Sequence, residues 1–276
     1  MNKPVQANLV EFKVRPFLKW AGGKRQLLKA LLARISTNDG VYHEPFVGGG
    51  AVFFALRPRE AVLSDINGRL IRTYLGVQND VEAVISRLNQ MPARREFFEA
   101  QRRLPIDSAA NSDLAAWFIY LNRTGYNGLY RVNRGGGFNV PFGRYENPRI
   151  CDAENLRASS EVLSAASVLA GDFEAVLNRA VPGDLVYFDP PYIPISLNSS
   201  FTRYTPEQFR IADHRRLRDV ALELKKRRVR VLISNSAAPQ VYALYERHFR
   251  IEILEASRSV NSDPLGRGKI AETLMS

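Results

Sequence analysis

The chain has 276 residues, and its 39 Lys and Arg against 28 Asp and Glu give a formal net charge of +11. An apolar share of 45%, with 10% aromatic residues, is enough for a globular core and excludes an intrinsically disordered chain. Cys151 is the only cysteine, which excludes an intramolecular disulfide or a cysteine metal cluster and fits a reducing compartment. We therefore expect a cytoplasmic protein with one large domain, or with one domain that carries an inserted second one.

Arginine far outnumbers lysine among the basic residues. The planar guanidinium suits phosphates and guanine edges better than an ammonium does, so this composition favours a nucleic-acid partner. A genome rich in G and C, which encodes arginine in place of lysine, would give the same composition. No apolar run is long enough to cross a bilayer, and residues 1–11 lack the apolar stretch of a secretory signal, so we expect no membrane contact.

Hydrophobic periodicity predicts alternating helices and strands in two parts of the chain. In chain order we expect a helix at 24–35, a strand at 41–47, a helix at 51–56, a strand at 61–64 and a helix at 69–75. The alternation resumes with a strand at 167–170, a helix at 173–179, a strand at 185–188, a helix at 207–227 and a strand at 229–234. The sequence therefore predicts an α/β fold with one parallel sheet built from two separated segments.

The segment between these two parts has a different pattern. Residues 80–124 show helical periodicity, and residues 125–145 contain two strand-like runs around the sequence NRGGG, which predicts a hairpin. Arginines and aromatic residues interleave in this hairpin, a mixture that suits phosphates and bases, although a solvated basic hairpin has the same composition. We therefore expect a helical domain at 76–150, inserted into a discontinuous domain made of 1–75 and 151–276.

A short polar motif, Asp189-Pro190-Pro191-Tyr192, follows the apolar run LVYF. Open α/β sheets bind their ligands at the carboxyl ends of such strands. A carboxylate and a proline-fixed carbonyl can accept hydrogen bonds from an exocyclic amine, and the tyrosine ring offers a face to a planar base. The alternative is a strand-end turn in which Asp189 caps a helix.

A glycine-rich turn, EPFVGGG at 44–50, ends the first predicted strand and allows a ligand to approach the backbone closely. Phe53 stands where the dinucleotide fingerprint needs Gly or Ala, which disfavours NAD. Asp65, at the tip of the next strand, can hold a ribose diol or cap the following helix. The segment FLKWAGGK at 17–24 lacks the P-loop residues at Leu18 and Arg25, so ATP binding is not supported.

Taken together and in their order, seven blocks resemble the Dam family of DNA adenine methyltransferases. The blocks are FLKWAGGK at 17–24, EPFVGGG at 44–50, DIN at 65–67, RTGYNGLYRVN at 123–133, FNVPFGRY at 138–145, DPPY at 189–192 and ISN at 233–235. The resemblance implies a Rossmann-like class I methyltransferase sheet with an inserted helical target-recognition domain and a β-hairpin that contacts DNA. It also implies transfer of methyl from S-adenosylmethionine to adenine N6 in double-stranded DNA, commonly in GATC, with S-adenosylhomocysteine as product and no metal.

The resemblance also assigns roles to individual residues. Catalysis falls to Asp189, Pro190, Pro191 and Tyr192. Cofactor contacts fall to Trp20, Ala21, Gly22, Lys24, Glu44, Phe46, Val47, Gly48, Gly50, Asp65, Ile66, Asp172, Phe173 and Asp189. DNA contacts fall to Lys19, Arg123, Tyr126, Asn127, Leu129, Arg131, Asn139, Pro141, Arg144 and Tyr145, of which Tyr126 and Asn127 accompany extrusion of the target base.

This sequence departs from the family pattern at three places. Gly49 stands where an alanine is frequent, and the hairpin turn RGGG has no acidic residue. Residues 272–274 look like the start of the family's last strand, but the chain ends at Ser276, so we expect a weakened sheet edge.

Rival reactions are separated by the chemistry they need. Methylation at cytosine C5 needs a cysteine nucleophile, and Cys151 lies far along the chain from every motif. N4-cytosine methylation remains open on chemistry alone, as does a DNA-binding protein that keeps the fold without activity. His43, His214 and His248 have no metal-ligand spacing, so we expect no metal. We expect a monomer, and the sequence leaves open whether a cognate restriction endonuclease is its partner.

Overall fold

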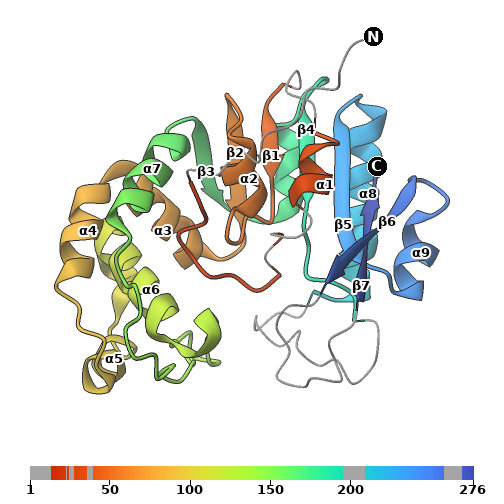
Figure 1. The fold of residues 1–276 in the computed structure, drawn as a ribbon. Helices are drawn as coiled ribbons and strands as arrows, with labels where there is room; N and C mark the ends of the chain where they lie inside the picture. Colours follow the sequence, from red (N-terminus) through yellow and green to blue (C-terminus); the bar gives the residue numbers. More distant parts are fainter. Residues whose placement is uncertain (1–13, 23, 25–27, 36–39, 195–208, 258–268) are drawn as a thin grey trace, which may run out of the picture.

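The computed structural model describes residues 14–22, 24, 28–35, 40–194, 209–257 and 269–276. Its centre is a seven-stranded sheet in the order β3-β2-β1-β4-β5-β7-β6 (Figure 1). The strands are β1 (Tyr42–Glu44), β2 (Ala61–Asp65), β3 (Ala166–Ala170), β4 (Leu185–Phe188), β5 (Arg230–Ser236), β6 (Ile251–Ser257) and β7 (Lys269–Met275). Strands β1 to β5 are parallel, and β7 runs antiparallel to both β5 and β6. The predicted α/β fold with a Rossmann-like methyltransferase sheet is confirmed.

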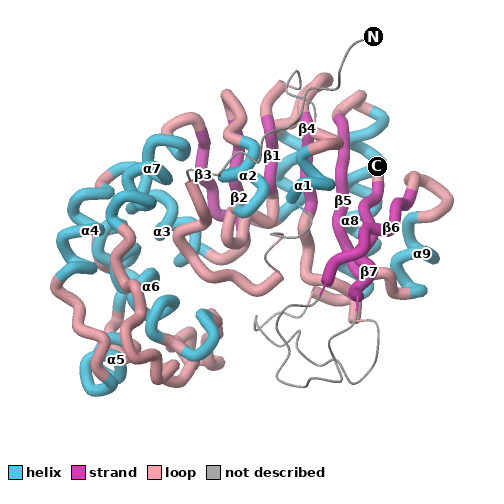
Figure 2. Tube along the Cα trace, in the orientation of Figure 1, coloured by secondary structure: helices cyan, strands magenta, loops and turns pink. Residues whose placement is uncertain are grey.

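Helices cover the sheet and extend beyond its β3 edge. They are α1 (Leu28–Leu32), α2 (Ala51–Leu56), α3 (Gly68–Asn79), α4 (Val81–Asn89), α5 (Arg95–Gln101), α6 (Asn111–Thr124), α7 (Ala153–Leu163), α8 (Ile211–Lys226) and α9 (Pro239–Tyr245), with short 3-10 helices η1 (Ile106–Ser108), η2 (Tyr126–Gly128) and η3 (Phe173–Asn178). Figure 2 shows the helices α3 to α7 gathered beside β3, while α9 lies at the opposite end of the sheet. All four residues of β4 are buried, as expected for a parallel strand with both faces covered.

The inserted helices share their core with the sheet. Helix α6 is apolar on nearly all sides, and Trp117, Phe118 and Leu121 on it belong to the same buried cluster as Leu63 of β2. Helix α6 packs directly on α3, so closely that a Cβ atom on Gly76 would lie 2.4 Å from the Asn111 carbonyl oxygen. The inserted segment therefore rests on the sheet through α3 rather than on a flexible linker.

Several predicted elements differ from the structure in extent or type. In the predicted helix at 24–35, α1 covers 28–32, while residues 25–27 lie outside the described residues, as do 207 and 208 at the start of the predicted helix 207–227. The strand predicted at 41–47 ends at residue 44, because the residues after it form the glycine turn. Residues 173–178 form a 3-10 helix, and α7, α9 and β6 were not predicted at all.

The predicted hairpin reverses direction with very little strand pairing. Isolated bridges join Gly125 to Phe142 and Val132 to Phe138, and between them the chain is irregular. Asparagine and glycine residues in the turn bond to one another instead, since the Asn133 side chain accepts from the backbone N–H groups of Gly135 and Gly137. The hairpin is therefore a folded loop with two bridges, not a regular ladder.

The expectation of a weakened last strand is wrong. β7 spans 269–275 and pairs with β6 along its whole length and with β5 from residue 272 to 275. The edge on this side of the sheet is β6, which the sequence analysis missed, because residues 251–257 do not follow a simple alternation. Among the residues that the structure describes, no helix combines the length and apolar character needed to cross a membrane.

The contact between α3 and α6 makes a testable prediction at Gly76. We expect Gly76→Ala to lower the free energy of unfolding by about 1–3 kcal/mol, the usual cost of overpacking, because its Cβ would also lie 2.7 Å from the Ala115 methyl. Gly68→Ala on the same helix is the control, since nothing lies within 4 Å of its Cβ, and we expect it to stabilise by about 0.4–1 kcal/mol. Urea unfolding measures both, and equal effects of the two variants would contradict the close packing.

Candidate active site

Two loops leave the middle of the sheet next to each other. β1 pairs with β2 on one side and β4 on the other, so the chain order reverses between β1 and β4. Open parallel sheets bind ligands at such a point, outside the carboxyl ends of the strands. We call residues 45–50, which follow β1, the glycine turn, and residues 189–192, which follow β4, the DPPY loop. These two loops define the candidate site.

The glycine turn needs glycine because its backbone is left-handed at two positions. Gly48 has φ 47° and Gly50 has φ 67°, a region that other residues rarely adopt. A Cβ on Gly48 would lie 2.7 Å from the Trp20 ring, and one on Gly50 would lie 2.7 Å from the Tyr74 hydroxyl. That hydroxyl donates to the Gly48 carbonyl at 3.0 Å. The backbone of the turn therefore packs directly on Trp20 and Tyr74. Val47 of the same turn is buried.

Asp65, at the end of β2, is held by backbone donors and does not cap a helix. Its carboxylate accepts from the backbone N–H groups of Gly48 at 3.1 Å and Asn67 at 3.0 Å. The side chain that caps α3 is Asn67, which accepts from the Leu70 N–H. Burial raises the pKa of Asp65 to about 6, although these backbone donors oppose the shift. The neighbouring Ile66 is 62% exposed, so a carboxylate and an open apolar side chain are adjacent at this strand end.

Trp20 joins the opening motif to the inserted segment. Its ring stacks on Phe118 of α6 and on Tyr130 of the hairpin, with centroids 6.3 Å and 6.1 Å apart. Ala21 and Gly22 follow it in an exposed turn. Trp20 therefore lies between the glycine turn and the inserted segment, and it contacts both.

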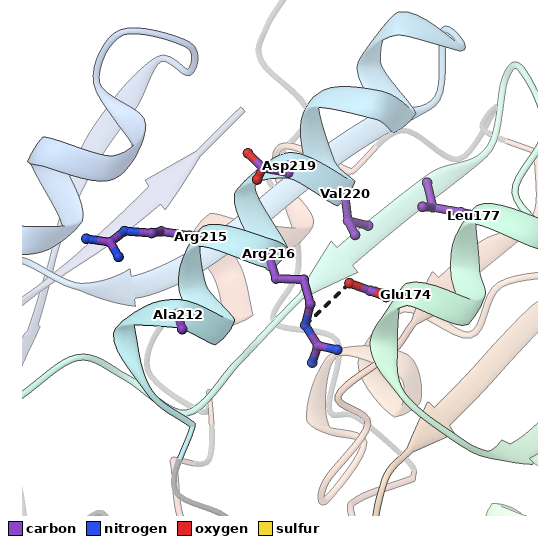
Figure 3. A pocket seen from close by; sticks show the side chains of 7 residues that line it. All are labelled: Glu174, Leu177, Ala212, Arg215, Arg216, Asp219 and Val220. Atoms are coloured by element: carbon purple, nitrogen blue, oxygen red, sulfur yellow. Dashed lines mark ion pairs between the residues drawn. The ribbon is translucent and has the colours of Figure 1, made fainter.

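Asp172 and Phe173 lie at the start of η3, after β3. Asp172 accepts from the Glu174 N–H at 2.9 Å and pairs with Arg216 of α8 at 2.9 Å. Phe173 is buried, stacks on Phe46 of the glycine turn with centroids 5.4 Å apart, and is covered by the Arg216 guanidinium. Figure 3 shows Arg216 paired with Glu174 in a surface pocket whose lining comes from η3 and α8. That pocket is separate from the two loops that define the candidate site.

Asp189, the first residue of the DPPY loop, has two partners on the same oxygen. The Ser234 hydroxyl of β5 donates to Oδ1 at 2.7 Å, and the Lys24 ammonium lies 2.9 Å from it. Lys24 is only 5% exposed; its ammonium also donates to the Gly22 carbonyl and lies 4.2 Å from the centre of the Tyr192 ring. Lys24, which the resemblance places among the cofactor contacts, therefore sits on the Asp189 carboxylate in this structure.

Strands β5 and β7 hold the rest of the loop. The Tyr192 hydroxyl donates to Glu272 of β7 at 2.6 Å. The Ile193 N–H donates to the Asn235 side chain at 3.1 Å, and the Ser236 hydroxyl donates to the Ile193 carbonyl at 2.5 Å. Burial is the main reason that the pKa of Tyr192 lies well above its usual value, so its hydroxyl is a protonated donor. Side chains of β5 and β7 therefore hold Tyr192 and Ile193, the end of the DPPY loop and the residue after it.

The two prolines of the loop have different surroundings. Pro190 is buried, whereas Pro191 is exposed and its backbone is hydrogen-bonded by His214 of α8. Burial lowers the pKa of His214 to about 4, so this ring is neutral near pH 7. A neutral imidazole N–H thus supports the loop from the side of α8.

Glu44, the last residue of β1, is buried. Its carboxylate accepts from the Tyr42 hydroxyl at 3.0 Å. Burial raises the pKa of Glu44 to about 8, and the nearby Asp189 acts in the same direction. The donors Tyr42 and Phe53 N–H and the Lys24 charge oppose the shift without cancelling it. Glu44 therefore carries a proton over part of the neutral range.

Asn122, a buried residue of α6, ties the opening motif to the hairpin. Its amide donates to the carbonyls of Lys19 at 2.8 Å and Gly128 at 2.7 Å, and its oxygen accepts from the Lys19 N–H at 2.8 Å. The Lys19 ammonium lies 4.6 Å from the centre of the Tyr145 ring. Lys19 and both ends of the hairpin are thus brought together on one side of α6.

The hairpin presents further predicted residues to solvent. Tyr126 is 52% exposed, and the next residue, Asn127, has φ 53°, a left-handed conformation that asparagine tolerates. Arg131 is exposed and donates from Nε and Nη2 to the Asn139 carbonyl at 3.0 Å and 2.7 Å. The remaining predicted DNA contacts in this segment are Asn139, Pro141 and Arg144, which are exposed, and Leu129 and Tyr145, which are half-buried.

Arg123 lies apart from this exposed group. Its Nη2 donates to the Phe17 carbonyl at 2.7 Å, and its Nε is buried without a partner among the described residues. Burial lowers the pKa of Arg123. This placement is that of a residue that holds the segment around Phe17 on α6, and the DNA contact expected from the sequence stays a prediction.

Sequence reasoning missed several residues that hold the site. Asn122 and Glu272 carry no motif signal of their own, since their roles depend on strands and helices that meet only in the folded chain. Ser234 and Asn235 lie in the block ISN, which marked a strand end but did not indicate that the two side chains hold the DPPY loop.

Comparisons with known proteins show which proteins this chain is similar to. The family model described as D12 class N6 adenine-specific DNA methyltransferase matches residues 20–260. The chain is 41% identical over 273 residues to the type II methyltransferase M1.LlaDCHI of Lactococcus lactis subsp. cremoris, covering 96% of each chain. It is 40% identical over 270 residues to the type II methyltransferase M.MjaIII of Methanocaldococcus jannaschii, covering 90% of this chain and 93% of the relative. It is 34% identical over 274 residues to the DNA adenine methylase of Vibrio cholerae, covering 95% of each.

The raised pKa of Glu44 predicts how stability depends on pH. The folded state keeps a proton that the unfolded state loses near pH 4.5, so the free energy of unfolding falls as the pH rises toward 8. Glu44→Gln removes this titration, and we expect it to flatten the fall between about pH 6.5 and 8, where the slope is at most about 1.4 kcal/mol per pH unit. In that window Asp65, with a pKa of about 6, has largely finished titrating in the folded state. His214, whose pKa is lowered from 6.5 to about 4 on folding, contributes equally to wild type and Glu44→Gln and cancels in their difference.

Urea unfolding at several pH values measures this slope. The control is Glu60→Gln, which removes an exposed carboxyl just before β2 and should leave the wild-type profile unchanged. Parallel pH profiles for wild type and Glu44→Gln would contradict the buried, proton-carrying Glu44.

Proposed function

This chain belongs to the D12 class of N6 adenine-specific DNA methyltransferases, and from that premise we propose that it methylates adenine in GATC after turning the base out of duplex DNA. The observation that carries the proposal is the placement of the DPPY loop beside the glycine turn, where the chain order of the sheet reverses. GATC is the site that the sequence resemblance implies.

The residues at the carboxyl ends of β1 and β2 fit S-adenosylmethionine. Gly48 and Gly50 allow the left-handed turn that packs on Trp20 and Tyr74, and this turn would present its backbone to the cofactor. The Asp65 carboxylate would hold the ribose hydroxyls, and the exposed Ile66 would cover a face of the adenine. Trp20 of the opening motif, which packs on the glycine turn, would border the cofactor. The partly buried Phe46 stacks on the buried Phe173 beside this turn, and Asp172 precedes Phe173.

The DPPY loop provides what an exocyclic amine needs in order to react. The lone pair on adenine N6 is delocalised into the ring, so alignment of the nitrogen matters more than removal of a proton before attack. Hydrogen bonds from N6–H to Asp189 and to the Pro190 carbonyl would favour a more tetrahedral nitrogen and direct its lone pair. The Tyr192 ring would stack on the base, with Pro191 beside it.

Methyl transfer breaks a carbon–sulfur bond of S-adenosylmethionine and forms a nitrogen–carbon bond at N6. Bound S-adenosylmethionine supplies an electrophilic methyl group and is left as S-adenosylhomocysteine, in which sulfur keeps the electron pair of the broken carbon–sulfur bond. The N6 lone pair forms the new nitrogen–carbon bond. The proton that N6 then loses can pass through the Asp189 carboxylate to solvent.

The inserted segment supplies the surface for DNA. We propose that residues 76–150 form the target-recognition domain, with Lys19, Tyr126 and the exposed hairpin residues facing the duplex. The exposed Tyr126 and the left-handed Asn127 support a role in filling the space that the extruded base leaves. A monomer is sufficient for this arrangement, since both loops and the hairpin come from one chain. The relatives named type II methyltransferases suggest a restriction endonuclease as partner.

The experiment that tests the proposed function maps methylated bases. Purified protein and S-adenosylmethionine are incubated with genomic DNA from cells that lack adenine methylation, and modified bases are then located by single-molecule sequencing. We expect N6-methyladenine in GATC. Methylation of adenine in another sequence would overturn the GATC assignment, and methylation of cytosine N4 or no methylation would overturn the proposed reaction.

Asp189→Ala tests the role of the DPPY loop. We expect methyl transfer to fall by about 100- to 1000-fold, the usual effect of removing a group that stabilises the transition state. Duplex affinity should change little, because in the proposed complex Asp189 touches only the extruded base. Transfer of tritiated methyl and a gel-shift titration measure the two effects. Asp219→Ala on α8, which removes an exposed carboxylate, is the control, and near-normal turnover of Asp189→Ala would reject the assignment.

Arg131→Ala tests reading of the DNA sequence. If its guanidinium contacts guanine O6 and N7, its loss should cost roughly 1–3 kcal/mol on the cognate duplex and much less on a duplex altered at the contacted pair. Arg134→Ala, from the exposed turn of the same hairpin, is the matched control and should weaken all duplexes together. kcat/KM on cognate and singly altered duplexes at two salt concentrations decides the question. A uniform loss for Arg131→Ala would show that it holds only the backbone of the DNA or of the hairpin.

A further inference from the structure

Glu272 of β7 lies in the candidate site, yet neither the motifs nor the proposed mechanism uses it. Its Oε2 accepts from the Tyr192 hydroxyl at 2.6 Å and lies 3.8 Å from the Lys24 ammonium. Its side chain is 19% exposed, so this carboxylate is largely removed from water. One oxygen of Glu272 thus faces both the ring expected to stack on the target base and the cation that sits on Asp189.

Lys24 occupies the place that the target amine needs. Its ammonium lies 2.9 Å from Asp189 Oδ1 and over the face of Tyr192, the two features expected to bind adenine N6 and the adenine ring. An ammonium and an exocyclic amine are both hydrogen-bond donors, so the two compete for the same carboxylate. The ammonium also lies over the Tyr192 ring, so a base can stack on that face and donate to Asp189 Oδ1 only after the Lys24 ammonium has shifted.

A buried ammonium cannot simply lose its partner. Lys24 is 5% exposed, and a buried charge without a counter-charge is strongly destabilising. Glu272 is the second carboxylate within reach, 3.8 Å away, and a small movement of the flexible lysine side chain would pair the two. With the cation on Glu272, Asp189 keeps its negative charge and can accept from the adenine amine.

We propose that Glu272 is a positioning residue for methyl transfer, which holds the Tyr192 ring in its stacking orientation and receives the Lys24 ammonium when the target amine binds Asp189. This inference rests on the proposed function, because it assigns the adenine to the Asp189 and Tyr192 side of the site. The fold supplies the geometry, since β7 runs between β5 and β6 and its register sets Glu272 opposite Ser236, which itself holds the DPPY loop.

The alternative is a structural role, in which Glu272 only satisfies the buried hydroxyl of Tyr192. Three substitutions separate the two roles. Glu272→Gln keeps an oxygen that accepts from Tyr192 but removes the charge that receives Lys24. Glu272→Ala removes both, and Tyr192→Phe removes the hydroxyl while it keeps the ring. Glu252→Ala is the matched control, because Glu252 is an ion-paired glutamate of the neighbouring strand β6 that pairs with Arg34 outside the site.

The experiment measures single-turnover methyl transfer on an unmethylated duplex that carries the site mapped for the wild type, together with S-adenosylmethionine affinity, duplex affinity and Tm. We expect Glu272→Ala to slow the transfer step by about 10- to 100-fold, as misplaced reacting groups do, with little change in the two affinities. Glu272→Gln should recover part of this loss. In the Tyr192→Phe background the difference between Ala and Gln at 272 should vanish, while the loss common to both should remain.

Three results would overturn the inference while the proposed function stands. They are wild-type transfer rates for Glu272→Ala and Glu272→Gln, a loss that appears only as a lower Tm or weaker cofactor affinity, and full recovery of the rate by Glu272→Gln. The last result would assign Glu272 to the tyrosine hydroxyl alone. If the wild-type protein itself fails to methylate adenine, the proposed function fails and this inference fails with it.

Discussion

The parallel pairing of β1 with β4 is the constraint on which the site depends. Tyr42 lies beside Leu185 and His43 beside Val186, so the segments that leave the two strands emerge side by side. The buried Asp184 secures this pairing, because its carboxylate accepts from the Val41 N–H and contacts His43 Nε2, both at 2.9 Å. Every later feature, from the glycine turn to the DPPY loop, follows from where these two short strands end.

The inserted segment is positioned by a second set of contacts, all of which use the opening motif. Asn122 holds the Lys19 backbone, and Trp20 stacks on Phe118 and Tyr130, so the segment before the sheet is fastened to α6 and the hairpin. The same tryptophan packs on the glycine turn. The hairpin and the glycine turn are therefore joined through contacts of one aromatic side chain.

The sequence predicted those parts of the site that are local. Buried apolar runs followed by Asp marked the ends of β2 and β4, because a strand and the residue at its tip are neighbours in the chain. The contacts of Glu272 and Asn122 could not be predicted, since they join residues 80 and 103 positions apart. Strand β6 was missed because its residues do not follow a simple alternation, and the 3-10 helix η3 was mistyped because its pattern also fits an α-helix. The hydrogen bond from Arg123 to the Phe17 carbonyl could not be predicted either, since it joins residues 106 positions apart.

Charge is concentrated at this site in a way that stability alone would not favour. Lys24, Asp189 and Glu272 are all largely removed from water, and nearby Glu44 has its pKa raised to about 8 by burial. Replacing buried ionic groups by apolar side chains is often stabilising, so such a cluster indicates a function that needs mobile charge. Two carboxylates that lie 2.9 Å and 3.8 Å from one ammonium offer it two ion-pair partners. In the proposed mechanism a ligand amine that hydrogen-bonds to Asp189 selects the pairing with Glu272, and the cation keeps a carboxylate partner throughout.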